Sequence, residues 1–191
     1  MKLLKDKILK EGKVLPGNIL KVDGFLNQRL DIGLLSAIGK EIADRFAGEK
    51  ITRILTVEVS GIALACLTAQ HFEGVPVIFG KKHKTLNAVT DVYVTKIFSF
   101  THNTEYDVTL SKRFLEKGDK VLIVDDFLAN GKAIVGLLDI IEQAGAELVG
   151  VGIAIEKGFQ GGGDALRKDG VRLESMAIVD EMKDGTIKFR E

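Results

Sequence analysis

The feature that most constrains the fold of this chain is a short apolar run with two aspartates directly behind it. Residues 121–124 read Val-Leu-Ile-Val, which is typical of a strand buried on both faces of a parallel sheet. Asp125 and Asp126 follow, and the small-residue loop 129–133 leads into an amphipathic segment that Gly145 ends. A strand buried on both faces needs helices above and below its sheet, so this run predicts an α/β protein.

In the rest of the chain, segments with the helical spacing of apolar residues alternate with segments that have the pattern of a strand. Apolar residues at helical spacing predict helices over 3–11, 34–46, 62–72 and 134–141, and a short helix to Lys168 that Asp164 would cap. Apolar or alternating runs predict a hairpin from 93–98 and 106–110, and strands over 51–57, 75–79, 148–155, 171–179 and 187–189. Strands that alternate with helices predict a mainly parallel sheet.

Composition narrows the class of protein. A chain of 191 residues suits one domain, and its 27 Lys and Arg residues balance 27 Asp and Glu residues, which leaves no excess charge for nucleic acid or anionic membranes. The apolar run 62–67 is too short to span a bilayer and the N-terminus lacks a signal-peptide apolar region, so we expect a soluble cytoplasmic protein. The one cysteine, Cys66, excludes an internal disulfide and is expected in the core beside Leu64.

The order of strand, acid pair, small loop and helix points to a binding site. In open α/β sheets, ligands bind beyond the carboxyl ends of the strands. Unpaired backbone N–H groups in the loop 129–133 and the helix dipole behind it suit a phosphate, and Lys132 adds positive charge. Ionised Asp125 and Asp126 only accept hydrogen bonds, so they suit sugar hydroxyls or hydrated Mg²⁺. An aspartate pair alone is more often part of a capped turn, and only the whole order of features favours a site.

Four stretches of the sequence resemble a known family. Val121–Ala133 resembles the phosphoribosyl-diphosphate (PRPP) motif of the type I phosphoribosyltransferases. Leu20–Asn27, Asp125–Gly131 and Ile155–Gln160 are similar to the bacterial xanthine phosphoribosyltransferases within that family. The resemblance covers nearly the whole chain and implies the type I fold, a central, mainly parallel sheet flanked by helices.

The resemblance also implies how the domain is divided. One phosphoribosyltransferase domain, 1–191, would have its core at about 33–155 and a small hood formed by 1–32, 156–191 and a flexible loop. In related enzymes that loop closes over the diphosphate, and it would begin at the cationic residues Lys81, Lys82 and Lys84. Judged by the residues alone, each lysine is equally suited to a solvated basic surface.

The implied reaction is transfer of the 5-phosphoribosyl group of PRPP to xanthine, which gives xanthosine 5′-monophosphate and pyrophosphate. Asp125 and Asp126 would be catalytic residues beside the ribose hydroxyls, and Mg²⁺ would be held mainly by PRPP, with no dedicated protein ligand. The other PRPP-binding residues implied are Lys82, a pyrophosphate loop of Glu58, Val59, Ser60 and Gly61, and a 5′-phosphate loop of Ala129, Asn130, Gly131, Lys132 and Ala133. Taken by its residues alone, 58–61 is a plain strand-to-helix turn.

For the base, the resemblance implies a xanthine site at Leu20, Asn27 and Lys157. An ammonium and an amide donate to both carbonyl oxygens of xanthine, and donors aimed at its 2-oxo group would stay unpaired against adenine. Phe127 and Phe159 would stack on the purine ring, although each is equally suited to the core.

The chain departs from many relatives in its phosphate loop. No threonine occurs in 129–133, and Ala129 stands where relatives acting on 6-oxopurines often have an aspartate that takes a proton from the base. We therefore expect xanthine, the more acidic purine, to supply its own anion or to lose the proton to water. Guanine or hypoxanthine as the base stays open, as does a non-catalytic PRPP sensor that binds nucleic acid, which zero net charge does not favour. The family implies a homodimer without membrane or nucleic-acid partners.

Overall fold

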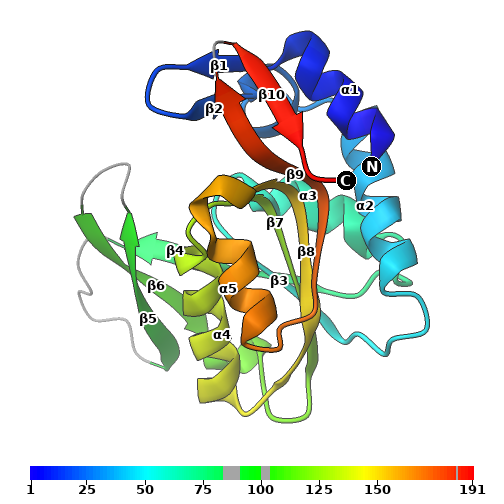
Figure 1. Ribbon diagram of the computed structural model, residues 1–191. Coiled ribbons are helices and arrows are strands. Elements are labelled where there is room, and N and C mark those ends of the chain that lie inside the picture. Colours follow the sequence, from blue (N-terminus) through cyan, green and yellow to red (C-terminus); the bar gives the residue numbers. More distant parts are fainter. Residues whose placement is uncertain (84–90, 100–103, 184) are drawn as a thin grey trace.

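An eight-stranded sheet lies at the centre of the protein (Figure 1). The computed structural model describes residues 1–83, 91–99, 104–183 and 185–191. The order of the strands across the sheet is β10-β9-β8-β7-β3-β4-β6-β5. Their bounds are β3 Arg53–Val57, β4 Val77–His83, β5 Val92–Ser99, β6 Thr104–Ser111, β7 Lys120–Leu128, β8 Glu147–Lys157, β9 Leu173–Lys183 and β10 Thr186–Phe189.

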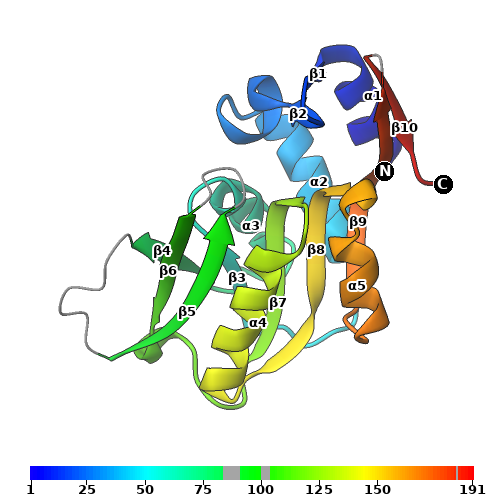
Figure 2. The ribbon, with the colours of Figure 1, turned by 60° about the vertical axis from the view of Figure 1, so that its left-hand side comes forward.

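The central strands β4, β3, β7, β8 and β9 run parallel, whereas β10 and the β5–β6 hairpin pair antiparallel at the two edges. Helices α2 (Ile32–Arg45) and α3 (Gly61–Ala69) cover one face, and α4 (Lys132–Ala144) and α5 (Gly162–Lys168) cover the other (Figure 2). The predicted mainly parallel sheet flanked by helices is therefore confirmed. In the described part of the chain, no helix combines the length and the apolar character needed to cross a membrane.

Alternate side chains of β7 enter two separate cores, which explains why the first half of this strand is apolar throughout. Leu122 and Val124 pack with residues of α2 and α3, whereas Val121 and Ile123 pack with residues of α4. All four side chains are fully buried, and each such burial contributes about 1.5–3 kcal/mol. The strand is thus held from both faces just before its aspartates.

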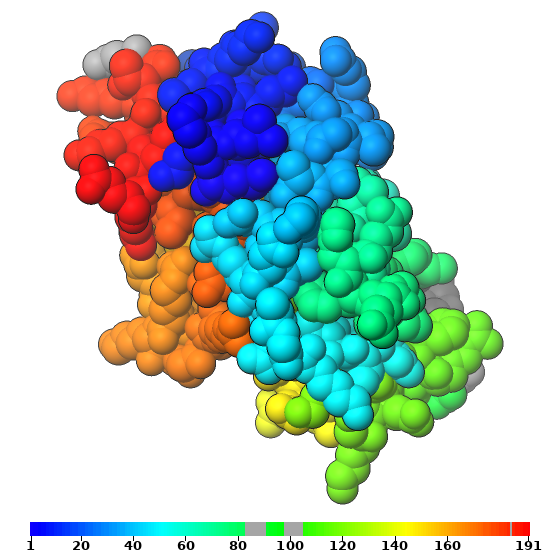
Figure 3. Space-filling model, turned by 90° about the vertical axis from the view of Figure 1, so that its right-hand side faces the viewer, coloured from blue at the N-terminus to red at the C-terminus, as the bar shows by residue number. Residues whose placement is uncertain are grey.

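The segment before α2 lies against the ends of β9 and β10. It contains α1 (Lys2–Glu11), β1 (Lys13–Leu15), β2 (Ile19–Lys21) and a π-helical turn at Asp23–Asn27. Figures 1 and 3 show this segment, in blue, side by side with the C-terminal strands, in red. The Met1 ammonium donates to the Met176 carbonyl, and Lys5 Nζ donates to the Arg190 carbonyl at 2.9 Å. A hood with the bounds 1–32 and 156–191 stays a prediction.

The strand β7 is longer than the apolar run predicts. It continues to Leu128, so Asp125 and Asp126 lie within the strand rather than behind it. The extension exists because β8 continues beside it, with Leu128 opposite Glu156. The acid pair is therefore fixed by sheet hydrogen bonds.

The strand β4 is also longer than predicted. It continues to His83, so Lys81 and Lys82 belong to a strand and not to the start of a loop, because both pair with β6. The predicted hairpin is confirmed as β5–β6. Lys84 lies outside the described residues.

Two side-chain placements predicted from the sequence are wrong. Cys66 is exposed, because α3 turns Leu64 toward the core and Cys66 away from it. Asp164 does not cap α5, since Gly161 is the N-cap and Asp164 lies in the first turn, where its carboxylate binds Arg190.

Gly39 of α2 provides a test of the helix packing. A Cβ at this position would stand 2.9 Å from the backbone nitrogen of Thr68 and 3.0 Å from the carbonyl carbon of Leu67 on α3. Gly39→Ala should lower the free energy of unfolding by about 1–3 kcal/mol, because two helix backbones must move apart. Gly33→Ala on the same helix is the control, since its Cβ would meet only Asp31 Oδ1 at 3.6 Å. Equal destabilisation of both variants in urea unfolding would contradict the close approach.

Candidate active site

The candidate site lies at the carboxyl ends of β3 and β7, which are parallel neighbours in the sheet. β3 leads into residues 58–61, and β7 carries the acid pair and leads into the loop 129–133. Asp125 and Asp126 are each only 5% exposed. The structure therefore brings the two segments predicted to bind PRPP to one edge of the sheet, where α/β proteins bind ligands.

Three segments of the chain meet at Asp126. Its Oδ1 accepts a hydrogen bond from the Ser60 hydroxyl at 2.9 Å, and its Oδ2 accepts one from the Asn27 amide at 3.5 Å. Ser60 follows β3, and Asn27 ends the π-helical turn before α2. One carboxylate thus connects the candidate pyrophosphate segment with the candidate base segment.

The second carboxylate of the pair is that of Asp125. Its Oδ1 accepts the backbone N–H of Asp126 at 2.9 Å. Burial, followed by the negative charge of Asp126, raises the pKa of Asp125 well above its usual value. Gly61 leaves the room that this arrangement needs, since a Cβ there would stand 2.2 Å from Thr56 Oγ1 and 2.5 Å from Asp125 Oδ1. The Thr56 hydroxyl is buried and has no hydrogen-bond partner within the described residues.

Residues 58–61 are joined to β4 by a side chain. Glu58 Oε1 accepts the backbone N–H of Lys82 at 2.5 Å, and Lys82 Nζ lies 5.2 Å from the centre of the Tyr106 ring. The peptide bond between Glu58 and Val59 is cis, and Val59 is 74% exposed. Lys82 therefore belongs to the candidate site through its strand.

The loop 129–133 turns directly into α4. The Asn130 Oδ1 accepts the backbone N–H of Lys132 at 3.1 Å, and Gly131 has φ +84°, the left-handed region that favours glycine. α4 begins at Lys132, so the first N–H groups of the helix have no partner inside it. This geometry is that of an anion-binding helix start.

The base candidates form two groups. Leu20 and Asn27 line a cavity of about 390 Å³ in the N-terminal segment, together with Leu15, Ile19, Lys21, Val22, Asp23 and Gln28. The Nζ of Lys157 lies 5.7 Å from the centre of the Phe127 ring, and burial lowers the pKa of Lys157. Neither Lys157 nor Phe127 lines the cavity. Phe159 follows Lys157 and is 36% exposed.

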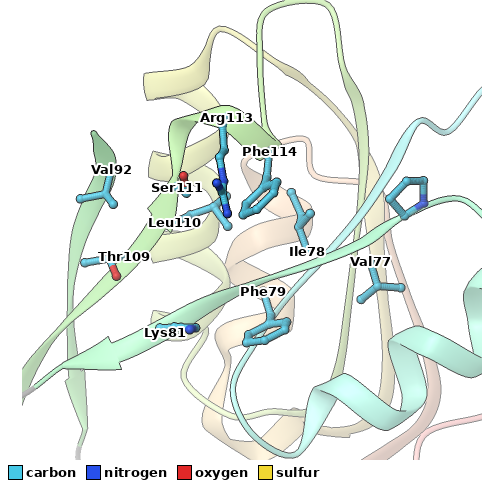
Figure 4. A pocket seen from close by; sticks show the side chains of 11 residues that line it. Val77, Ile78, Phe79, Lys81, Val92, Thr109, Leu110, Ser111, Arg113 and Phe114 are labelled. Atoms are coloured by element: carbon cyan, nitrogen blue, oxygen red, sulfur yellow. The ribbon is translucent and has the colours of Figure 1, made fainter. Parts of the chain in front are cut away.

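A larger cavity of about 690 Å³ lies away from these residues, against β4 and β6 (Figure 4). Its lining is mostly apolar: Pro76, Val77, Ile78, Phe79, Lys81, Val92, Thr109, Leu110, Ser111, Arg113 and Phe114. The Arg113 guanidinium stacks on the Phe114 ring at 4.4 Å. None of the acid pair, the two loops or the base candidates borders it, so size alone does not locate the candidate active site.

Comparison with known proteins decides the family. A family model described as the phosphoribosyl transferase domain matches residues 27–180. The chain belongs to the phosphoribosyltransferase family. It is 54% identical over 190 residues to a xanthine phosphoribosyltransferase from Clostridioides difficile (strain 630), with 100% of both chains covered. It is 56% identical over 192 residues to one from Lachnoclostridium phytofermentans, covering 100% of this phosphoribosyltransferase and 98% of the relative.

Solved structures share the phosphoribosyltransferase fold at lower identity. The APRTase from Giardia lamblia complexed with 9-deazaadenine has a TM-score of 0.77 and 22% identity, covering 94% of this chain and 98% of that one. An adenine phosphoribosyl transferase from Trypanosoma brucei has a TM-score of 0.74 and 20% identity, and the match covers 92% of this chain and 78% of that chain. Likeness at these identities shows the fold alone, and it confirms the type I architecture.

The sequence reasoning missed the residues that support the loop 129–133. Glu156 is fully buried and pairs with Arg167 at 2.7 Å. Gly162 lies so close to the loop that a Cβ would stand 2.4 Å from the carbonyl oxygen of Ala129. The one signal in the sequence is the glycine run 161–163, which reads as an ordinary loop without the structure.

Replacing Asp125 with asparagine should stabilise this phosphoribosyltransferase at neutral pH. The folded state raises the pKa of Asp125 above its unfolded value. The wild type therefore loses stability as the pH rises from the unfolded-state pKa to the folded-state pKa of this group. Asp125→Asn removes the ionisation, so its free energy of unfolding at neutral pH should exceed that of the wild type. The gain should disappear near about pH 3, where the side chain is protonated in both states. Urea unfolding at both pH values measures the difference, and a gain independent of pH would contradict the cause.

Proposed function

We propose that this phosphoribosyltransferase transfers the 5-phosphoribosyl group of PRPP to xanthine, giving xanthosine 5′-monophosphate and pyrophosphate. The choice of base is supported by the relatives named xanthine phosphoribosyltransferase, which match over the full chain. The observation that carries the proposal is the Asp126 carboxylate, which accepts hydrogen bonds from Ser60 and Asn27. It lies where the leaving group, the ribose and the base of such a reaction must meet.

PRPP is held by both loops of the candidate site. Backbone N–H groups of 129–133 and the start of α4 bind the 5′-phosphate, helped by Lys132. Residues 58–61 and Lys82 bind the pyrophosphate end, and Asp125 with Asp126 accepts hydrogen bonds from the ribose hydroxyls. This assignment is supported by the shared sheet edge and by the left-handed Gly131 at the start of the helix.

The acid pair also stabilises charge during the transfer. The bond from C1′ of the ribose to pyrophosphate breaks as the purine nitrogen approaches, and positive charge develops on the sugar. Asp125 and Asp126 are fixed by sheet hydrogen bonds in a poorly hydrated site, where a carboxylate interacts more strongly with positive charge than in water. The developing charge favours ionisation of Asp125, whose pKa is raised in the free protein.

Xanthine is recognised by its two carbonyl oxygens and its acidity. The Lys157 ammonium and the Asn27 amide donate to the base, while Leu20 and Phe127 contact the ring. Burial lowers the pKa of Lys157, and an anionic base beside it restores the preference for the charged form. No side chain at Ala129 takes the proton, so xanthine enters as its own anion.

Mg²⁺ enters with PRPP. Within the described ranges, no group of three or more His, Cys, Asp or Glu side chains is arranged to hold a metal ion. The carboxylate oxygens of Asp125 and Asp126 are the ligand type that hydrated Mg²⁺ prefers, so the donor set fits an ion carried mainly by the substrate. When bound, Mg²⁺ neutralises charge on the leaving pyrophosphate.

The protein acts as a cytoplasmic homodimer of single domains, each with a core and a hood. The homodimer is the oligomeric state that the resemblance to the family implies. Sedimentation at several concentrations distinguishes the dimer from a monomer.

A base panel tests the function directly. With PRPP and Mg²⁺, kcat/KM for xanthine should exceed that for hypoxanthine or guanine by at least about tenfold, because buried donors reject a base that leaves them unpaired. Pyrophosphate release measures all three reactions. A faster reaction with hypoxanthine or guanine would show that this base is the preferred substrate. No release of pyrophosphate with any base would refute the proposed transferase activity.

Lys157→Ala should reduce the preference for xanthine over hypoxanthine, which lacks the 2-oxo group. The ratio of the two kcat/KM values should fall by about 10–100-fold, the size of a lost charge-assisted hydrogen bond. Lys168→Ala is the control, because this exposed lysine ends α5 and lies outside the proposed site. Equal losses on both bases would contradict a role for Lys157 in reading xanthine.

A further inference from the structure

A buried ion pair lies beside the candidate site, and the proposed reaction does not use it. Glu156, next to Lys157 on β8, has a fully buried side chain. It accepts hydrogen bonds from Arg167 Nη1 at 2.9 Å, from Arg167 Nη2 at 2.7 Å and from the Ser175 hydroxyl at 2.5 Å. We call these three residues the Glu156 clamp. With three donors on two oxygens, the carboxylate is fixed in one orientation.

The carboxylate of the clamp contacts the first turn of α5. A Cβ at Gly163 would stand 2.0 Å from Glu156 Oε1 and 2.4 Å from its Cδ, closer than any real contact. The Gly163 backbone therefore lies directly on the carboxylate. Arg167 reaches the same carboxylate from the last turn of α5, which lies beside β8 and β9 (Figure 2). Both ends of the helix are thus held by one acidic side chain.

The residue before Gly163 contacts the loop 129–133. A Cβ at Gly162 would stand 2.4 Å from the carbonyl oxygen of Ala129 and 2.5 Å from the backbone nitrogen of Gly131. β8 also places Glu156 opposite Leu128, the residue that precedes the loop. An unbroken series of backbone contacts therefore runs from the carboxylate to the loop.

We propose that Glu156 is a positioning residue for the loop 129–133, acting through Gly162 and Gly163. The inference rests on the proposed role of this loop in binding the 5′-phosphate. The loop contains no hydroxyl side chain, so its backbone N–H groups must themselves point at the phosphate. Hydrogen bonds weaken steeply as their angle closes, so the clamp controls affinity for the 5′-phosphate. Pyrophosphate binds at 58–61 and does not depend on it.

A second network keeps α5 attached when the clamp is weakened. Arg190 binds Asp164 of α5 at 2.7 Å and Asp180 of β9 at 2.8 Å. Neither of these two ion pairs involves Glu156. A change at Glu156 therefore shifts the position of α5 against the sheet without detaching the helix.

Glu156→Gln tests the proposal, because it keeps the size of the side chain and removes its charge. Calorimetric titration with ribose 5-phosphate should show affinity about tenfold weaker, as is common when the support of a binding group is lost. Titration with pyrophosphate and Mg²⁺ should change less than about twofold. The KM for PRPP should rise and the KM for xanthine should not. The control is Glu174→Gln, which removes a pair with Arg45 (2.9 Å) and should change neither affinity.

The outcomes separate the possible failures. An equal loss for both ligands, or no loss for either, overturns the positioning role. If Glu156→Gln does not fold, Ser175→Ala decides, because it removes one donor of the clamp and should weaken ribose 5-phosphate by about two- to threefold. Gly131→Ala tests the loop itself, because Gly131 has φ +84° and a side chain there strains the backbone that would bind the phosphate. No effect of Gly131→Ala on ribose 5-phosphate refutes the proposed phosphate site, whereas a loss there with none for Glu156→Gln refutes only the clamp.

Discussion

The burial of two adjacent carboxylates at the end of a central strand is the constraint on which the rest of the candidate site depends. Burial and the charge of Asp126 raise the pKa of Asp125, so the free protein holds this carboxyl at a cost in stability. The backbone N–H of Asp126 offsets part of that cost, whereas Gly61 leaves only room, and the nearby Thr56 hydroxyl is itself without a partner in the described structure. A strained polar arrangement of this kind is typical of a site kept for chemistry.

The two halves of the site are supported differently. The proposed PRPP half is built on β7, whose side chains are packed against helices on both faces, so its aspartates have little freedom. The base half includes the turn at Asp23–Asn27, which is anchored by the buried Phe25 and Leu26 and meets Asp126 through one amide. The two halves thus meet at a single carboxylate, that of Asp126.

How much the sequence could predict depends on whether a residue's environment is local. Val121–Val124 reveals its burial because a strand covered on both faces is apolar without interruption. This pattern placed the acid pair correctly toward the carboxyl end of β7. The ends of β4 and β7 were missed because their polar residues are held by neighbouring strands. Cys66 was misplaced because α3 is apolar around most of its circumference, so periodicity does not choose a face.

The phosphate half shows why a motif describes only part of its site. Hydroxyl side chains can rotate to meet a phosphate, but residues 129–133 have none, so in the proposed site the path of the backbone would decide the affinity. That path depends on the left-handed Gly131 within the motif and on Gly162 outside it, where any side chain would collide with the loop. The next residue, Gly163, lies on the carboxylate of Glu156, which the sheet places opposite Leu128. A change in 156–163 would therefore act on the proposed ribose-phosphate site although no residue of the motif had changed.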